Sequence, residues 1–260
     1  MIAYKISPTI EGIFCALFES FTIKEIPQII FSGDFQPSFD CKIKTIQNID
    51  ENVSRVKKGI IKNGGISLLS AIFYAFRSSD ELKETIIFNA ARKCLSARKN
   101  LLDDYKDPDI LAFYELKTKI SFEAHRMLGF VRFEKSKGGV WYANISPDNN
   151  IVDLLAPHFN KRFPKEKFVL HDDKRHLLCI CDGKNTITFK SQEPITVYLD
   201  DDEVEFQNLW RVYFNSVSIK ERKNQKLQDD YLPRRYRKRM TEFLEDVNNE
   251  ILSPSLLVEE

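Results

Sequence analysis

Several features that identify a biochemical class are absent from this sequence. It has no Gly-rich phosphate loop, no G-x-S-x-G, no H-E-x-x-H and no pair of C-x-x-C motifs, so the NTPases, hydrolases and zinc enzymes that such motifs identify lose support. No run approaches the roughly 18 uncharged apolar residues that a membrane helix needs, and the N-terminus has neither a basic region nor a cleavage site. We therefore expect a cytoplasmic protein with no membrane segment, no metal site and no cofactor.

Cysteine is scarce and odd in number. Five cysteines in a chain of 260 residues indicate reduced thiols, because a chain of this size does not need disulfides to be stable. Cys179 and Cys181 lie in an apolar run that predicts a strand, in which alternation points both sulfurs to one face. Their C-x-C spacing is not that of zinc or redox sites, so we expect buried core thiols.

A strong net charge is also missing, but the balance of 39 Lys and Arg against 38 Asp and Glu hides a local asymmetry. Residues 220–239, here called the basic segment, carry nine basic and three acidic side chains. Acidic runs at residues 200–205 and 241–260 flank this segment. A local band of positive charge can hold phosphates even when the net charge of the chain is near zero.

What the sequence does contain is enough apolar material, 43% of residues, for a real core. Apolar residues recur at helical spacing through most of residues 8–129, with an edge strand predicted at 1–6, an extended piece at 41–46 and a helix stop at Asn63-Gly64-Gly65. After Gly129 the period changes to alternation. Antiparallel strands are predicted at residues 130–133, 140–145, 168–170, 177–181 and 186–189.

Two further helices are predicted among these strands, at residues 149–160 and around Val204–Tyr213. The second is amphipathic, and we expect its Trp210 and Tyr213 in the core. The predicted fold class is α+β, with a helical N-terminal part followed by an antiparallel sheet flanked by helices. The predicted division is a mainly helical part at residues 1–115, a part with the sheet and the basic segment at 116–246, and an acidic tail at 247–260.

The histidines supply the candidates for acid–base chemistry. All four, His125, His158, His171 and His176, fall within 52 residues, and a neighbouring carboxylate can orient a histidine as a general base. The candidate catalytic residues are Glu123, His125, His171 and Asp172. Their spacing matches no standard metal-ligand pattern, and purely structural histidines remain an alternative.

Cations and aromatic residues alternate through the sheet region and continue into the basic segment, and such side chains hold phosphates and stack bases. Many of the aromatics are alternatively core residues, and the basic segment is alternatively a solvated loop. We also expect residues 123–126 to share a polar cleft with Arg132, His158 and Arg162. The candidate nucleic-acid-binding residues are Arg126, Arg132, His158, Arg162, Arg175, Arg211, Arg222, Asn224, Gln228, Arg234, Arg235 and Tyr236.

Ordered blocks along nearly the whole chain resemble a known family, the bacterial "probable DNA metabolism" proteins, whose core is a domain of unknown function. The most extensive block is EAHRMLGFVRF at residues 123–133, and the other blocks lie at residues 11–19, 145–148, 155–163, 171–175, 209–214, 222–228 and 232–236. This chain departs from the family pattern at Asn149, where His is usual, and at Arg237, where Trp is common.

The resemblance implies a context in DNA metabolism. Members of the family occur beside a radical SAM protein that has a helix-hairpin-helix DNA-binding region, and also fused to a uracil-DNA glycosylase domain. We therefore predict an accessory protein without independent catalytic activity, which binds DNA or another nucleic acid in DNA repair or modification and works with a radical SAM partner. The alternatives are a metal-independent enzyme that acts on a nucleotide or base, and a scaffold whose basic segment docks onto an acidic protein.

Overall fold

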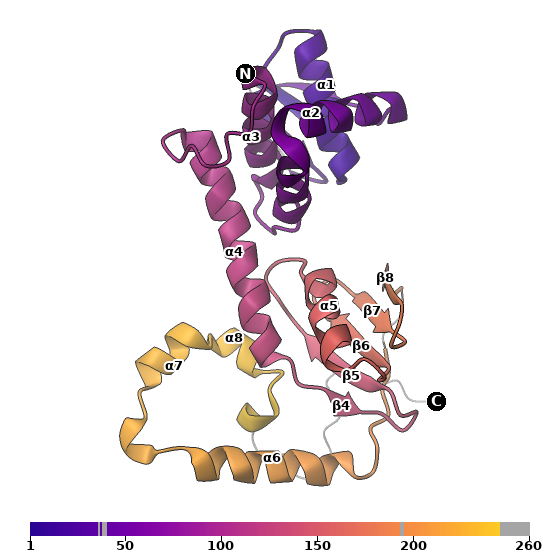
Figure 1. Cartoon of the computed structure of the whole chain (residues 1–260), viewed down its shortest axis with the longest axis vertical. Helices are drawn as coiled ribbons and strands as arrows, with labels where there is room; N and C mark the ends of the chain where they lie inside the picture. The colour runs from indigo at the N-terminus through magenta and orange to yellow at the C-terminus, as the bar shows by residue number, and fades with distance from the viewer. Residues whose placement is uncertain (36, 38–40, 193–194, 245–260) are drawn as a thin grey trace. The chain divides into compact units, whose positions relative to one another are not determined.

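The structure is a computed structural model that describes residues 1–35, 37, 41–192 and 195–244. The predicted acidic tail at 247–260 lies outside these residues. The chain forms two compact units, Met1–Phe122 and Glu123–Glu260 (Figure 1). Helix α4 (Pro108–Phe130) continues from the first unit into the second, so the predicted division after residue 115 falls inside a helix. Within the described residues, no helix is both long enough and apolar enough to span a bilayer.

The first unit contains a three-stranded parallel sheet. β1 (Ile2–Ile6) lies between β2 (Ile29–Ser32) and β3 (Lys42–Thr45) and is parallel to both. The prediction of an edge strand at residues 1–6 is therefore wrong, and β2 is missing from the predicted elements. Parallel neighbours need a crossover connection, which α1 (Ile10–Thr22) supplies between β1 and β2.

The helices of the first unit follow the predicted apolar spacing. α1 packs on α2 (Asp50–Ala75), which packs on α3 (Lys83–Ala97). Phe14, Ile60 and Phe88 are fully or almost fully buried among them. The predicted stop at the two glycines is confirmed as a break in α2 at Gly65, whose φ of 77° lies in the left-handed region that favours glycine.

The second unit contains a five-stranded sheet. The strands are β4 (Glu134–Lys135), β5 (Trp141–Ile145), β6 (Phe168–Asp172), β7 (Leu177–Cys181) and β8 (Thr186–Lys190), adjacent in that order. The α+β class is confirmed, but the sheet is mixed, because β5 and β6 are parallel. The reason is α5 (Val152–Arg162), which connects them as a crossover helix. α4 extends to Phe130, so the strand predicted at 130–133 gives way to the shorter β4.

The two faces of this sheet differ in chemistry. α5 covers one face, where the Cys181 Sγ donates to the Asn160 Oδ1 at 3.1 Å and where the cross-strand neighbours of Cys181 and Cys179, Phe168 and Leu170, are fully buried. The expectation of buried thiols at these two positions is confirmed. Alternation places Tyr142 and other polar residues of β5 and β6 on the opposite face.

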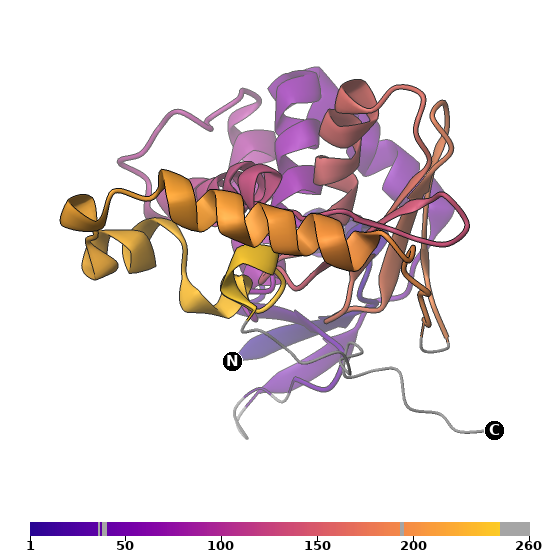
Figure 2. The same ribbon diagram turned by 90° about the horizontal axis from the view of Figure 1, so that it is seen from below.

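The remainder of the second unit is a series of helices. α6 (Glu203–Val217), η1 (Lys220–Arg222), α7 (Gln225–Tyr231), α8 (Arg234–Arg237) and η2 (Thr241–Phe243) follow one another. After α6 the chain turns and returns through α7 to α8 (Figure 1), and Figure 2 shows α6 as a straight helix at the surface. Our expectation that Trp210 and Tyr213 lie in the core is wrong. Val204, Phe206, Leu209, Trp210 and Tyr213 are all exposed.

Candidate nucleic-acid interface

The basic segment becomes a turn followed by two short helices rather than an irregular loop. Within it, Arg222, Lys223, Lys226, Arg234, Arg235 and Lys238 are exposed. Asn224, one of the predicted nucleic-acid-binding residues, caps α7, because its Oδ1 accepts from the Leu227 backbone N–H at 3.0 Å. Gln228 is partly buried, and its Oε1 accepts from the Gln225 Nε2 at 3.2 Å. Both side chains therefore have structural roles.

The Asp229 carboxylate forms ion pairs with two arginines of the basic segment. It accepts from the Gln225 Nε2 at 2.9 Å, from the Arg234 Nε at 3.1 Å and from the Arg237 Nη2 at 2.6 Å. These donors, Gln225 first, lower the pKa of Asp229 to about 2. The Arg234 side chain remains 74% exposed despite this contact, so it can also reach a phosphate.

Lys226 and Lys238 differ from these arginines. Within the part of the chain that the structure describes, neither lysine makes an ion pair. They come from α7 and from the residue that follows α8, and both side chains are exposed. Neither residue is among the candidates that the sequence alone supplies. No signal in the sequence separates these two lysines from the paired arginines, because Arg234 and Arg237 lie five and eight residues from Asp229, and these are not helix-neighbour spacings.

Glu123 lies at the centre of a buried network that holds α8 in place. Its Oε1 accepts from the Asp148 backbone N–H at 2.5 Å and from the Tyr236 hydroxyl at 2.8 Å. Its Oε2 accepts from the backbone N–H and the Nδ2 of Asn149, at 2.9 and 2.6 Å. Arg235 stacks on the Tyr236 ring at 4.6 Å and reaches Asp148 at 2.8 Å. The carboxylate of Glu123 is thus fully engaged in holding the structure together.

The structure does not bring the candidate catalytic residues together. His125 is exposed whereas Glu123, two residues earlier on α4, is buried, as expected for positions that do not share a helix face. Asp172 and His171 are consecutive on β6 and so point to opposite faces of the sheet. Neither predicted dyad is joined by a hydrogen bond among the described residues.

Asp172 instead anchors Arg175. Its Oδ2 accepts from the Arg175 Nη1 at 2.9 Å, and the same nitrogen donates to the Pro147 carbonyl at 3.0 Å. The Arg175 Nη2 donates to the Asp148 carbonyl. Burial raises the pKa of Asp172 and the contact with Arg175 opposes that rise. Arg175 is therefore a clamp on the loop after β5 and has few donors left for a phosphate.

The remaining candidate nucleic-acid-binding residues either contact other side chains or are exposed. Arg132 is paired with Glu242 at 2.5 Å and lies 5.7 Å from the Trp210 ring. The Arg211 Nη2 donates to the Asn208 Oδ1 at 2.6 Å. Arg126, His158 and Arg162 are exposed. No hydrogen bond among the described residues links His125, Arg126, His158 or Arg162 to the Glu123 network.

A polar cluster that the sequence does not reveal lies on the face of the sheet opposite α5. The Tyr142 hydroxyl and the His171 Nδ1 are 2.6 Å apart. Burial lowers the pKa of His171, which keeps it neutral, and raises that of Tyr142. Glu134 lies directly opposite Tyr142 in the β4–β5 pair. A hydroxyl, a neutral imidazole and a carboxylate on one face are groups that can exchange protons.

Glu134, which is partly buried, shares a donor with the buried carboxylate of Glu203. The Gln207 Nε2 donates to the Glu134 Oε1 at 3.3 Å and to the Glu203 Oε1 at 3.2 Å. The other oxygen of Glu203 accepts from the Lys135 backbone N–H at 2.9 Å. Burial, and after it the charge of Glu203, raises the pKa of Glu134. These contacts attach the start of α6 to β4. Among the described residues, no group of three or more His, Cys, Asp or Glu side chains could hold a metal.

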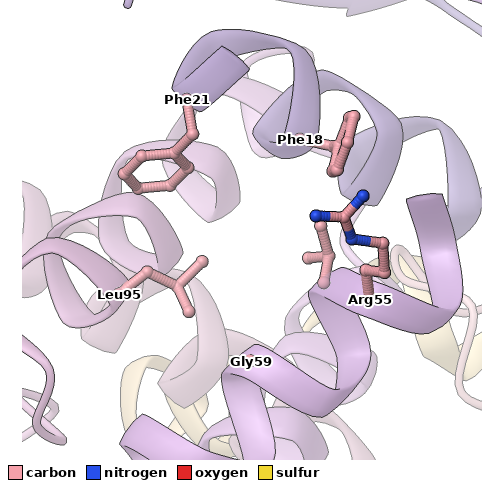
Figure 3. Close-up of a pocket in the computed structure, with 6 residues that line it drawn as sticks. Phe18, Phe21, Arg55, Gly59 and Leu95 are labelled. Carbon is pink, nitrogen blue, oxygen red and sulfur yellow. The ribbon is translucent and has the colours of Figure 1, made fainter.

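A pocket of about 300 Å³ lies in the first unit, between α1, α2 and α3 (Figure 3). Its lining is mostly apolar, and the Arg55 guanidinium lies over the Phe18 ring at 5.0 Å. Gly59 forms part of its floor. The lining residues are Phe18, Phe21, Arg55, Val56, Gly59 and Leu95. With a single cation and no acid–base pair among them, this pocket is separate in chemistry from the basic segment.

Comparison with known proteins adds one finding. A family model described as a domain of unknown function, DUF4130, matches residues 81–242, more than half of the chain. The match includes all of the basic segment and most of the described second unit. No curated protein and no solved structure matches the chain.

Proposed function

This chain belongs to the DUF4130 family, and we propose that it binds nucleic acid through α7 and α8, as an accessory protein in DNA repair or modification. The observation that carries the proposal is that Lys226 and Lys238 are exposed and form no ion pair with the described part of the chain. Lysine that is not neutralised by the protein itself is available to displace counterions from phosphates.

Neighbouring side chains support the same surface. Arg234 and Arg235 are exposed beside these lysines even though each also contacts an aspartate. Tyr231, at the end of α7, is 68% exposed and offers an aromatic face on which a base can stack. Phosphate contacts give affinity without sequence preference, which suits an accessory protein that another component directs to its target.

The resemblance of the ordered sequence blocks to "probable DNA metabolism" proteins supports DNA as the nucleic acid and a radical SAM protein as the partner. The proposed place of action is the bacterial cytoplasm.

The test is the salt dependence of DNA binding by the full chain, measured by fluorescence anisotropy on single-stranded and double-stranded oligonucleotides. For the double variant Lys226→Gln and Lys238→Gln, we expect the slope of log affinity against log salt on duplex DNA to fall by about two, roughly one unit for each lost phosphate contact. The matched control is Lys57→Gln with Lys58→Gln, which removes the same charge from exposed lysines of α2.

Equal slopes in the test and control variants would contradict an interface at α7 and α8. Salt-insensitive binding, or no binding to either form of DNA, would contradict the nucleic-acid proposal and favour the scaffold, in which the basic segment docks onto an acidic protein.

One observation favours a second candidate, metal-independent chemistry on a nucleotide or base. The contact between Tyr142 and His171 joins a hydroxyl to a neutral imidazole, an arrangement suited to a general base. Nuclease and nucleotide-hydrolysis assays on the purified chain test it. Turnover that disappears in His171→Gln but persists in His125→Gln would support this candidate, and no turnover would remove it.

A further inference from the structure

α6 exposes a continuous stripe of apolar side chains. Phe206, Leu209, Trp210, Tyr213 and Val217 recur at i, i+3, i+4, i+7 and i+11, which places them along one side of the helix. We call this set the α6 stripe. Phe206, Leu209 and Tyr213 are 62%, 57% and 56% exposed. Single exposed apolar residues are ordinary, but a contiguous set marks an interaction surface.

The rest of α6 shows that most of the stripe is distinct from the side that packs on the protein. Trp210 lies at the border between the two sides, because its Nε1 donates to the Glu242 Oε2 at 3.1 Å and the Arg132 guanidinium lies over its ring. Gln207 and Phe214 are the inward residues: Gln207 donates to the carboxylates of β4 and α6, and Phe214 packs on Phe243 with ring centroids 5.8 Å apart. Exposed polar residues such as Asn208 and Asn215 occupy another side of the helix. The solvent-exposed surface of α6 therefore has an apolar side and a polar side. This pattern is typical of a helix that packs against a partner on its apolar side.

The charges at the two ends of α6 identify the partner. Exposed Asp201 and Asp202 precede the helix, although Asp201 also pairs with the Lys137 Nζ at 2.8 Å, and exposed Arg222 and Lys223 follow it. When two such helices lie antiparallel, the acidic end of each faces the basic end of the other, whereas a parallel arrangement places like charges together. We propose that the α6 stripe is the interface of a homodimer, in which a second copy of this chain packs its own α6 antiparallel on the first.

The proposed register also matches apolar side chains. An antiparallel pairing that sets Phe206 opposite Val217 also sets Trp210 opposite Tyr213, so four of the five stripe residues face one another, while Leu209 falls opposite Phe214. The same register places the acidic start of each α6 at the C-terminal end of the other, which Arg222 and Lys223 follow. An interface in which one surface patch contacts itself about a two-fold axis is the usual arrangement of a homodimer. α7 and α8, which carry the proposed nucleic-acid surface, contribute nothing to the stripe.

The first test is the oligomeric state of the full chain without nucleic acid, measured by sedimentation velocity over a range of concentrations. We expect a dimer, and we expect Leu209→Asp or Tyr213→Asp to raise its dissociation constant by about tenfold or more. Ile187→Asp is the matched control, because Ile187 on β8 is 64% exposed but lies outside the stripe. Circular dichroism reports whether each variant is folded.

The second test addresses orientation through charge. Asp201→Lys with Asp202→Lys gives two basic ends, so we expect it to weaken the dimer. Adding Arg222→Asp and Lys223→Asp to the same chain reverses both ends, and we expect dimerisation to return to the wild-type level. Three outcomes would each overturn the proposal: a wild-type chain that stays monomeric, a dimer that Leu209→Asp leaves intact, and a variant with all four charges reversed that does not associate. A monomer that associates only with a different protein belongs among these contradicting outcomes.

Discussion

Glu123→Gln tests whether the network under α8 is structural. The carboxylate of Glu123 accepts four hydrogen bonds, from the Asp148 N–H, the Asn149 N–H, the Asn149 Nδ2 and the Tyr236 hydroxyl. An amide has only one acceptor atom, so its NH2 group must face two of these donors. The Tyr236 hydroxyl can turn to accept from the amide, but the Asp148 N–H cannot and would remain buried without a partner.

Leaving one buried donor unsatisfied costs about 1–3 kcal/mol, and replacing charge-assisted bonds with neutral ones adds about 1 kcal/mol. We therefore expect Glu123→Gln to lower the free energy of unfolding by about 2–4 kcal/mol. Urea unfolding followed by tryptophan fluorescence measures this in the second unit, because Trp141 and Trp210 are its reporters and the chain has only two Trp.

Tyr236→Phe provides the calibrating variant, since it removes a single donor from the carboxylate. We expect it to cost about 1 kcal/mol and to be non-additive with Glu123→Gln, because the two side chains share a hydrogen bond. An unchanged urea midpoint for Glu123→Gln would refute the reasoning. Unchanged stability with lost activity on a nucleotide would instead restore Glu123 as a catalytic residue.

Two further predictions concern stability. Burial and the charge of Glu203 raise the pKa of Glu134, so between the unfolded and the raised pKa the folded wild type binds more protons than the unfolded chain. Glu134→Gln is therefore expected to stabilise the protein at neutral pH, with a gain that shrinks as the pH falls through the raised pKa and levels off below the unfolded value. A gain that is independent of pH would contradict this prediction. Gly59→Ala is expected to stabilise the folded protein by about 0.5–1 kcal/mol, because an added methyl group meets no atom closer than 3.6 Å. Gly12→Ala is expected to destabilise it, because the added methyl group would lie 2.6 Å from the Ser7 carbonyl oxygen. Chemical denaturation of both variants measures the two effects.

The sequence predicts elements better than their pairing. β7 has the predicted bounds and α5 lies close to its predicted position, since both follow from apolar periodicity. The parallel pairing of β5 and β6 is missed, although the helix predicted between them is the connection that a parallel pair requires. The apolar pattern of each segment does not show which strands are neighbours, so it cannot show that this helix is a crossover between two adjacent strands.

The candidate site shows a different limit. Arg175 and Arg222 look equivalent in the sequence, yet one clamps a loop on Asp172 and the other is exposed. Which cation is neutralised depends on carboxylates brought close by the fold, and these are not visible in a linear charge count. Amphipathic spacing likewise predicts that the α6 stripe is covered, but it cannot distinguish a core from a partner.

The buried thiols provide a means of following each unit separately. Cys15 and Cys94 are buried in the first unit and Cys179 and Cys181 in the second, whereas Cys41 is partly exposed. Burial raises the pKa of the Cys94 and Cys179 thiols, which disfavours the reactive thiolate. Alkylation at these positions is therefore limited by how often the surrounding unit opens, and modification counted at each cysteine over time gives separate opening rates for the two units from one sample.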